Sequence, residues 1–409
     1  MEFGFTEDQE RLRKEIRNFF MEELPEDYEP GFNNMMGKEV QDWWMQLKEK
    51  AIKKGYYVPG WPKQYGGSGF TEIEQCILDE EQGSFGITWP DFLGLHLVGP
   101  SLMMFGTEEQ KKRWIPPIAR GETVCFEAFT EPDAGSDEAN IGCRAEEDGN
   151  DFVFNGQKIF ISGWYKPTWL FTLARTKDTE PKHRGLSLFL LPADLPGISF
   201  RPLPTMGGGR QNFVFFDNVR VPKANLLGEL NRGFYHAMQV FEFERRMTGD
   251  AAGNKRSLQE LVQFCKETIS DGKPLIEKQE VRKALSSLAV EIEVQRLAGW
   301  YSSWRFAQRE KLGPAQYELS NYYAKKLGAS HAKRMIDILG LYGQLSTGSK
   351  WSALAGRLEK MWKVTRSLHA GGTFEVIKIV LAQRGLGLPR IPAHLMKAIG
   401  DSVMKSTKG

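Results

Sequence analysis

The sequence has few of the residues that hold metals or disulfides. Its four cysteines are far apart and show no CxxC spacing, which argues against a zinc site or a disulfide framework and predicts reduced, buried thiols. They are Cys76, Cys125, Cys143 and Cys265. The six histidines are equally scattered, without an HExxH segment, so we expect no metal centre. A nucleotide cofactor would need a cradle other than a Rossmann or P-loop site, because GxGxxG and Walker A sequences are both missing.

An excess of one charge and long apolar runs are missing too. The chain has 54 Lys and Arg against 52 Asp and Glu, a net charge of +2, so we expect neither nucleic acid nor an anionic membrane as a partner. The most apolar stretch, 92–105, is short and interrupted by glycine, histidine and proline, which argues against membrane insertion. The N-terminus resembles neither a signal peptide nor a transit peptide, so we expect a cytoplasmic protein.

The composition and periodicity are those of a globular protein of 409 residues with two or three domains. Helical periodicity opens the chain, starting with a capping box of Thr6 and Gln9. Short runs rich in Phe, Val, Ile and Trp, such as DFVFNG and KIFIS, then follow. Several are separated by turn signals, which indicates antiparallel hairpins. Helical segments long enough to form a bundle follow. The sequence therefore predicts an α+β, mostly α, fold with a helical domain at 1–120, an antiparallel β domain at 121–228 and a C-terminal four-helix bundle at 229–409.

Two segments of the β region carry residues that suit a flat ligand with polar edges. FTEPDAGSD at 129–137 offers two hydroxyl groups, and its small residues let backbone N–H groups approach a ligand closely. In NGQKIFISG at 155–163, strand alternation places Phe160 and Ser162 on one face. Either segment alone reads equally well as a turn or a core strand. Together on one module they favour a cofactor site.

With GLGLPR at 385–390, these segments resemble signature segments of the acyl-CoA dehydrogenase family, in the same order over nearly the whole chain. The resemblance implies FAD bound between the middle and C-terminal domains and at a subunit interface. The family usually has Trp and Thr at the positions of Phe160 and Ser162, and both substitutions preserve the chemistry. The flavin-binding residues implied are Phe129, Thr130, Gly135, Ser136, Phe160, Ser162, Thr373 and Glu375.

Members of this family remove the α-proton of an acyl-CoA with a carboxylate while the β-hydrogen leaves as hydride to the flavin. Many carry this base in a Tyr-Glu-Gly-Thr segment near the C-terminus, but the matching stretch here, 370–373, reads Ala-Gly-Gly-Thr. Other branches place the base on a bundle helix, in a Glu-Arg pair. VFEFERRMTG at 240–249 matches that position with Glu244, and makes Arg245 a candidate ligand of the CoA or a partner of Glu242.

A helical count supports Glu244 independently of the resemblance. Apolar or small residues lie one or two turns away on the same helix face, namely Ala237, Val240, Phe241, Met247 and Thr248. A carboxylate on such a surface has a raised pKa, which suits a general base near neutral pH. Glu242 is spaced to pair with arginines instead. The alternative for Glu244 is a buried ion pair within the bundle.

Two other residues compete for a role in the chemistry. His369 lies next to the vacant C-terminal segment and is more simply structural. Asp91 lies on the apolar stretch that in the family helps to line the acyl pocket, where it would recognise a polar or cyclic substrate or remove a proton further from the thioester. Asp91 reads equally well as a helix N-cap after Pro90.

The sequence departs from the family where a neighbouring subunit usually holds the FAD pyrophosphate and adenine. An Arg-x-x-Phe-Gly-x-Pro segment is replaced by TISDGKP from Thr268 to Pro274, and Gln-x-x-Gly-Gly by DILGL from Asp337 to Leu341. Asp271 would repel a pyrophosphate. Either Lys273 or a nearby basic residue replaces the lost arginine, or a different subunit supplies the missing contacts.

The sequence thus predicts an FAD-dependent α,β-desaturation of an acyl-CoA, such as a branched, cyclic or aromatic one, with electrons passed to an electron-transfer flavoprotein. The chain would form a homotetramer or a heteromer with a related subunit. Two alternatives remain open. One is non-oxidative elimination on a bound acyl-CoA, and the other is a non-catalytic partner subunit that completes a neighbour's FAD site.

Overall fold

The computed structural model describes residues 4–25, 28, 38–89, 91–163, 166–207, 210–245, 251–308, 315–365, 371–390 and 392. Side chains are described throughout these ranges except at 38–41, 210, 242–245 and 315–317. Helices come first, then a sheet, then longer helices, as the sequence predicts. None of the described helices is long and apolar enough to cross a lipid bilayer.

The first part of the chain is helical. Its elements are α1 (Glu7–Glu23), α2 (Lys38–Lys54), the short turn η1 (Lys63–Tyr65), α3 (Glu72–Ser84), the π-helical turn η2 (Gly94–Val98), α4 (Gly99–Phe105) and α5 (Glu108–Ala119). Three of these helices begin with the same device. Thr6, Thr71 and Thr107 each accept a bond from the backbone N–H three residues on, while the Gln or Glu there bonds back. The capping box predicted at Thr6 is confirmed.

The middle part is a sheet. Its strands are β1 (Cys125–Ala128), β2 (Arg144–Asp148), β3 (Asp151–Ser162), β4 (Trp169–Arg175), β5 (Leu186–Pro192), β6 (Ile198–Pro204), β7 (Arg210–Pro222) and β8 (Leu226–Leu227), with short turns η3 (Glu138–Asn140), η4 (Lys182–Gly185) and η5 (Lys223–Asn225) between them. They pair in the order β6-β7-β3-β2-β4-β5-β8, with β1 also on β4. Most pairs are antiparallel as predicted, but β1 and β2 both pair with β4 in parallel. Apolar alternation shows a strand's faces and not its direction, so the sequence did not reveal these pairs.

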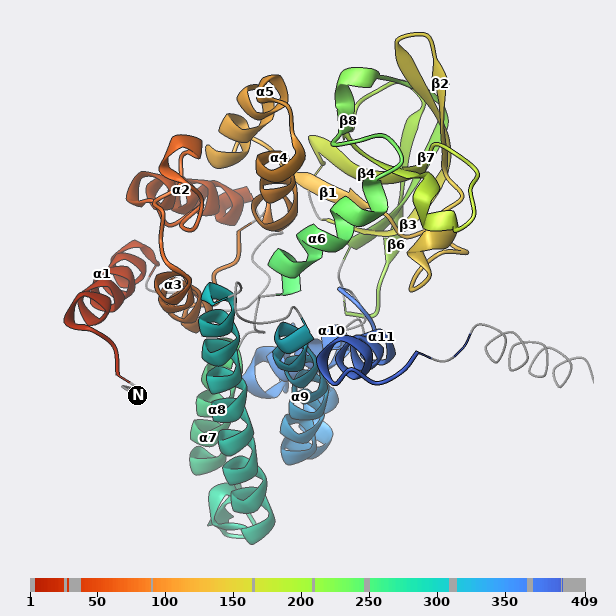
Figure 1. The fold of residues 1–409 in the computed structure, drawn as a ribbon. Helices are drawn as coiled ribbons and strands as arrows, with labels where there is room; N and C mark the ends of the chain where they lie inside the picture. The colour runs from red at the N-terminus through yellow and green to blue at the C-terminus, as the bar shows by residue number, and fades with distance from the viewer. Residues whose placement is uncertain are drawn as a thin grey trace, which may run out of the picture.

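The last part is helical again, with a small hairpin. Its elements are α6 (Gly233–Arg245), α7 (Ala251–Glu267), β9 (Ile269–Ser270), β10 (Lys273–Pro274), η6 (Leu275–Glu277), α8 (Gln279–Ala307), α9 (Ala315–Leu339), η7 (Gly340–Gln344), η8 (Ala353–Gly356), α10 (Arg357–Val364), α11 (Phe374–Val380) and the π-helical turn η10 (Leu381–Gly385). Helices α7, α8 and α9 project away from the rest of the molecule, whereas α6 runs diagonally from the sheet toward the other helices (Figure 1).

The packing of α6 differs from the bundle helix that the sequence predicts. Its buried residues Ala237, Val240 and Phe241 join a core shared by the N-terminal helices and the strands β1, β4 and β5. The bundle has a separate core, built from α7, α8, α9 and α10. Periodicity gives the apolar face of a helix but not the partner that covers it. As a result, α6 lies at the junction of all three parts.

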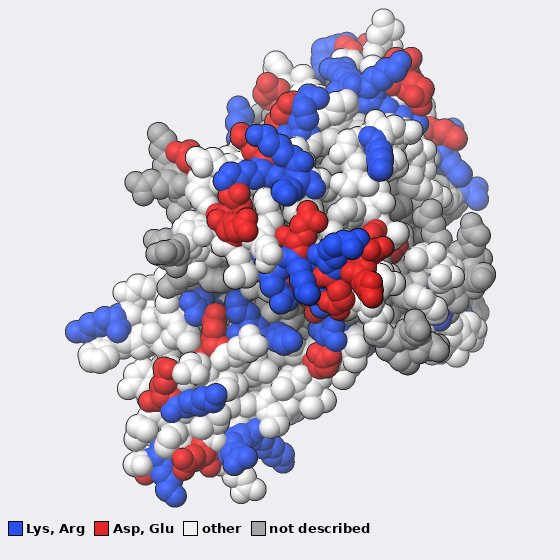
Figure 2. Space-filling model, turned by 90° about the vertical axis from the view of Figure 1, so that its left-hand side faces the viewer, with Lys and Arg blue, Asp and Glu red and all other residues white. Residues whose placement is uncertain are grey.

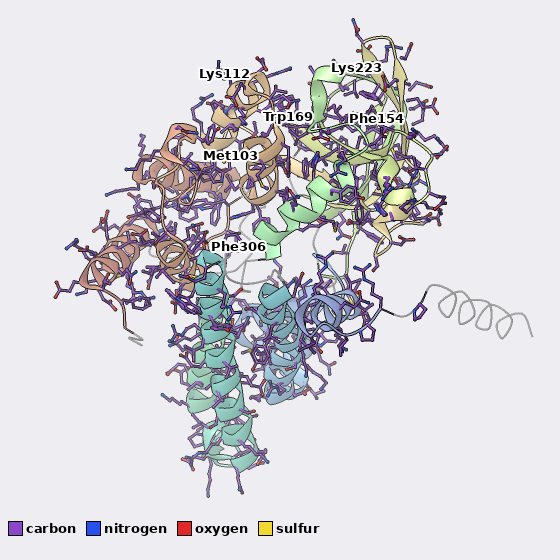
Figure 3. The ribbon with its side chains drawn as sticks, in the orientation of Figure 1. Met103, Lys112, Phe154, Trp169, Lys223 and Phe306 are labelled. Carbon is purple, nitrogen blue, oxygen red and sulfur yellow. The ribbon has the colours of Figure 1, made fainter. Side chains whose placement is uncertain are left out.

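The same shared core joins the sheet to the N-terminal helices. Trp169, at the start of β4, lies between the sheet and α5, where its ring is 5.7 Å from that of Trp114 (Figure 3). Phe154 belongs instead to a second core inside the sheet. The four cysteines form no disulfide with one another, and all but the half-buried Cys76 are buried, as expected.

Candidate active site

A buried ion pair ties together the two segments singled out in the sequence. The ammonium group of Lys158, fully buried in β3, lies 2.8 Å from Oε1 of Glu131 in the FTEPDAGSD segment. Its Nζ also donates to the backbone oxygens of Phe129 at 3.0 Å and Leu173 at 2.7 Å. Three acceptors satisfy the three donors of an ammonium group. Lys158 therefore fixes the segment against both β3 and β4.

Glu131 extends this network to the next stretch of chain. Its carboxylate accepts bonds from the backbone N–H groups of Gly142 at 2.7 Å and Cys143 at 2.9 Å. A tight turn follows, in which Glu131 and Ala134 bond to each other's backbone. The turn places Gly135 and Ser136 at the surface. A Cβ on Gly135 would meet no atom within 4 Å, so the fold itself does not require glycine there. Glycine at this position would let a ligand approach the backbone closely, and the flavin contact implied for it stays a prediction.

Phe160 stands out at the end of β3. It has a φ of +60°, a conformation that costs a bulky residue free energy, and its ring is 46% exposed. The strand is irregular between Lys158 and Ile161, next to it. The preceding N–H, of Ile159, donates to the oxygen of Thr130 at 2.9 Å, so the strand end and the FTEPDAGSD segment lie side by side. Ser162 is exposed like Phe160, in agreement with the expected alternation.

Gly163 ends the NGQKIFISG segment, and the fold itself requires glycine at this position. A Cβ on Gly163 would lie about as close as 1.8 Å to the ring of Phe126, which is impossible without rearrangement. Glycine here lets the chain cross a β1 aromatic ring directly after Ser162. It therefore supports the site from within the fold, in contrast to Gly135.

Phe129 turns its ring into the core, and the flavin contact implied for this residue stays a prediction. Its ring is buried, 5.3 Å from that of Phe171 and 6.0 Å from that of Phe241. A ring in the core cannot stack on a cofactor, so among the two phenylalanines of these segments only Phe160 presents its ring. Phe129 instead joins the FTEPDAGSD segment to α6, because Phe241 belongs to that helix.

The predicted base lies at the end of α6. Val240 and Phe241 are buried, which confirms the described half of the apolar stripe, and Glu244 follows them by one helical turn. The side chains of Glu244 and Arg245 lie outside the described residues, as do Met247, Thr248 and His369. The backbone of α6 nevertheless brings Glu244 to the face whose preceding turn packs on the FTEPDAGSD segment.

Asp91 is buried in a polar cluster between the N-terminal helices and β1. Its Oδ1 accepts from the backbone N–H groups of Cys125 at 2.7 Å and Gly94 at 3.0 Å, and its Oδ2 accepts from the Thr123 hydroxyl at 3.3 Å. The Gly94 bond is the capping interaction weighed in the sequence. Burial raises the pKa of Asp91 to about 6 despite these three bonds. Its carboxylate thus holds the start of β1, and a contact with substrate stays a prediction.

The C-terminal segment supplies a helix cap. Thr373 is the N-cap of α11, where its Oγ1 accepts from the N–H of Val376 at 3.2 Å. Its hydroxyl hydrogen can still be donated to a ligand. Glu375 is exposed in the first turn of α11. The flavin contacts implied for both residues stay predictions.

The segments that depart from the family lie at the surface. Thr268 to Pro274 form the hairpin β9-β10, with Asp271 and Gly272 at its tip, both at positive φ. Lys278 lies 2.8 Å from the Asp271 carboxylate, and this bond lowers the pKa of that carboxyl. Asp337 pairs with Lys333 at 2.6 Å, and Leu341 is 81% exposed. Lys278 thus pairs with Asp271 beside the hairpin, and the replacement of the lost arginine by Lys273 or a nearby basic residue stays a prediction.

The sequence analysis missed Lys158 and Glu131, although both stand inside the two segments it singled out. The available signal was a lysine in an otherwise apolar strand of one segment and a glutamate in a turn of the other. Their partnership could not be read from sequence, because the two residues are 27 positions apart and meet only when β3 and β1 are adjacent. Among the described residues, no three His, Cys, Asp or Glu side chains gather as a metal site would require.

The architecture is that of a three-domain enzyme with its candidate site where helices, sheet and bundle meet. Family models match nearly the whole chain: the N-terminal domain of acyl-CoA dehydrogenase at 6–122, its middle domain at 126–219 and its C-terminal domain at 231–386. The chain therefore belongs to the acyl-CoA dehydrogenase family and is an oxidoreductase with that activity. Members of this family typically bind FAD.

Known relatives cover nearly the whole chain. Acyl-CoA dehydrogenase FadE26 of Mycobacterium tuberculosis is 30% identical over 400 residues, 95% of this chain and 99% of that protein. A chain of the ChsE4-ChsE5 complex from Mycobacterium tuberculosis has a TM-score of 0.86 at 30% identity, covering 96% of this chain and 100% of that chain. The Tcur3481-Tcur3483 steroid ACAD has a TM-score of 0.84 at 30% identity, with the same coverage.

Proposed function

We propose that this chain catalyses FAD-dependent α,β-desaturation of an acyl-CoA, with Glu244 as the base, and belongs to the branch of the family that carries the base on this helix. One observation carries the proposal. Phe241 of α6 packs on Phe129 of the FTEPDAGSD segment, with the ring centres 6.0 Å apart, and Glu244 follows one turn later on that face. The helix of the base and the segment of the cofactor are thus in direct contact.

The residues that surround this contact suit a flavin. Phe160 presents an exposed ring to a flat ligand, and Thr130, Ser136 and Ser162 offer hydroxyl groups to polar ring edges. Gly135 leaves its backbone open to close approach. Bound FAD would supply the acceptor for the hydride that leaves the β-carbon.

Glu244 would take the α-proton of the thioester. An apolar helix face would limit hydration of its carboxylate, which would raise the affinity for a proton toward neutral pH. Arg245 would bind the CoA or pair with Glu242. Electrons would pass to an electron-transfer flavoprotein.

The missing C-terminal glutamate points to a branched, cyclic or aromatic acyl group. Structural relatives support the cyclic option, because the Tcur3481-Tcur3483 protein is a steroid ACAD. The elements η2 and α4, which pack against α6, would help to line the acyl group.

A heteromer is the second candidate. The β9-β10 hairpin segment carries Thr268 and Asp271 where the family usually presents Arg and Phe to the neighbouring FAD. The ChsE4-ChsE5 and Tcur3481-Tcur3483 structures both contain two named chains. We propose that a related subunit supplies the missing contacts to the adenosine half.

Anaerobic titration of the full-length chain with straight, branched and ring-bearing acyl-CoAs tests both proposals through bleaching of the flavin absorbance. We expect Glu244→Gln to slow bleaching by about 10²-fold to 10⁴-fold, the usual contribution of a general base. Glu242→Gln is the matched control and should bleach at the wild-type rate. Equal bleaching by both variants would contradict Glu244 as base. A colourless chain that gains flavin only with a related subunit would support the heteromer.

A further inference from the structure

Glu127 places a carboxylate on the strand β1, directly before the FTEPDAGSD segment. The other three residues of this strand are buried, whereas Glu127 is half-buried. Glutamate is uncommon inside a sheet, because removing its charge from water is costly unless a polar partner is at hand. The proposed reaction uses no group on β1. The carboxylate of Glu127 therefore lacks a role in the chemistry described so far.

Strand alternation and pairing show which face of the sheet Glu127 occupies. Side chains two positions apart on an extended chain point to the same face, so Glu127 shares its face with Cys125 and Phe129. Its paired residue on the neighbouring strand β4 is Phe171. Cys125, Phe129 and Phe171 all belong to the core that the sheet shares with α6 and the N-terminal helices. Glu127 therefore faces these helices and not the core inside the sheet.

The same face adjoins the elements proposed to line the acyl group. Strand β1 packs on η2, and both η2 and α4 pack on α6. Phe129, two positions beyond Glu127, packs on Phe241 of α6, with the ring centres 6.0 Å apart. Glu244 follows Phe241 by one helical turn. The carboxylate of Glu127 is therefore expected at the wall of the acyl site, on the side of the sheet that α6 covers.

The setting of Glu127 differs from that of acidic residues at the surface. On the face that Figure 2 shows, acidic side chains lie at the surface with basic ones beside them. Water and neighbouring charges satisfy such groups, so they indicate no ligand. Glu127 is flanked along its strand face by the hydrophobic core instead. An ionised carboxylate offers about four acceptor sites and no donor, so a bond to its own chain still leaves sites for a donor on a ligand.

We propose that Glu127 accepts a hydrogen bond from a hydroxyl group on the acyl part of the substrate. This inference rests on the proposed function, which supplies the acyl-CoA. A hydrogen bond from a hydroxyl to a carboxylate is stronger than one between two neutral groups. A second carboxylate on the acyl group would be repelled. The inference narrows the substrate from branched, cyclic or aromatic acyl-CoAs to those that carry a hydroxyl.

Binding of acyl-CoAs to the FAD-loaded Glu244→Gln variant, alone or with a related subunit, tests this recognition without turnover. The probes are cyclohexylpropanoyl-CoA, the same compound with one hydroxyl at each ring position in turn, and the same compound with a ring carboxylate. We expect one hydroxyl compound to bind at least about tenfold more tightly than the unsubstituted probe, the effect of a hydrogen bond to a charged group. The carboxylate probe should bind more weakly. Calorimetric titration measures the dissociation constants, and no preference for any hydroxyl compound would overturn the inference.

Substitutions of Glu127 in the same background separate recognition from structure. Glu127→Leu should lose the preference for the hydroxyl compound, because leucine accepts no hydrogen bond. Glu127→Gln keeps an acceptor without the charge, so it should keep part of the preference and no longer disfavour the carboxylate probe. Glu146→Leu, at an exposed position of β2, is the matched control and should change none of the dissociation constants. Equal weakening of every probe by both Glu127 variants would make Glu127 a structural residue and overturn the inference.

Flavin bleaching of the wild type by the same probes distinguishes this inference from the proposed function. Bleaching without a preference for a hydroxyl compound would overturn the role of Glu127 and leave the desaturation standing. Preferential binding without bleaching would contradict the desaturation and leave the recognition by Glu127 standing. Unchanged thermal unfolding of each variant verifies that the chain is folded.

Discussion

The segment around Lys158 and the β9-β10 hairpin are proposed to serve opposite ends of FAD, the first at the ring of the chain's own cofactor and the second at the adenosine half of a neighbour's. Around Lys158 the charges are buried and every donor of the ammonium has an acceptor inside the chain. In the hairpin, Asp271 is exposed and its ion pair with Lys278 lies at the surface. Breaking a buried ion pair costs several kcal/mol of stability, whereas breaking an exposed pair costs very little. In the proposed site this chain alone would thus fix the ring half, whereas the adenosine half would leave room for a second subunit.

The largest effect is expected at Lys158. Lys158→Met keeps the volume but leaves the Glu131 carboxylate without its cation and two backbone oxygens without a donor. We expect the free energy of unfolding to fall by about 3–5 kcal/mol, measured by urea denaturation, and flavin retention to fall with it. Lys223→Met, which removes the exposed pair with Glu147, is the control and should cost less than about 1 kcal/mol. Equal losses of unfolding free energy in the two variants would contradict the expected difference between buried and exposed pairs.

The pH dependence of stability tests the effect of burial on Asp91. Its pKa in the folded protein, about 6, is above the ordinary value of 3.8, so the folded state binds an extra proton between these values. The stability that this proton contributes is present below pH 4 and is lost as the pH rises through 6. Asp91→Asn should remove this loss of stability, which is worth roughly 1.4 kcal/mol per pKa unit. From pH 4 to pH 7 the unfolding free energy of the variant should therefore rise by about 2 kcal/mol relative to that of the wild type. Unfolding curves at several pH values measure the difference, and parallel pH profiles would contradict it.

A substitution at Phe160 should change flavin binding without lowering the stability of the fold. Asn tolerates positive φ better than Phe, so Phe160→Asn should leave the flavin-free chain as stable as before or stabilise it by up to about 1 kcal/mol. Loss of the ring should weaken flavin binding by about tenfold, a free energy of about 1.4 kcal/mol. Thermal unfolding of the flavin-free protein and flavin titration measure the two effects. A parallel fall in both would make Phe160 a structural residue.

The smallest effect is expected at the hairpin. Asp271→Asn keeps a residue that tolerates positive φ and removes an exposed charge. We expect the free energy of unfolding to change by less than about 0.5 kcal/mol and flavin affinity to rise by a few-fold at most, measured by the same two methods. A tenfold gain would show that this carboxylate lies close to the cofactor's phosphates in the assembled protein.

Local patterns predicted the elements of the fold. The capping box at Thr6 follows from two residues three positions apart, and the strand runs follow from apolar alternation. Strand β2, with the sequence RAEED, has no such alternation and was missed. The runs DFVFNG and KIFIS proved to be one strand, β3, because Gly156 and the irregularity near Phe160 bend it without ending it.

By itself the sequence determined the order of the three parts, the capped helices and the two segments that carry the family resemblance, since each depends on residues close together in the chain. Only the tertiary structure decided that Lys158 meets Glu131, that Phe129 turns inward while Phe160 stays outside, and that α6 packs on the sheet. Those outcomes depend on which surfaces meet after folding. Such pairings join residues tens to hundreds of positions apart, and no local pattern encodes them.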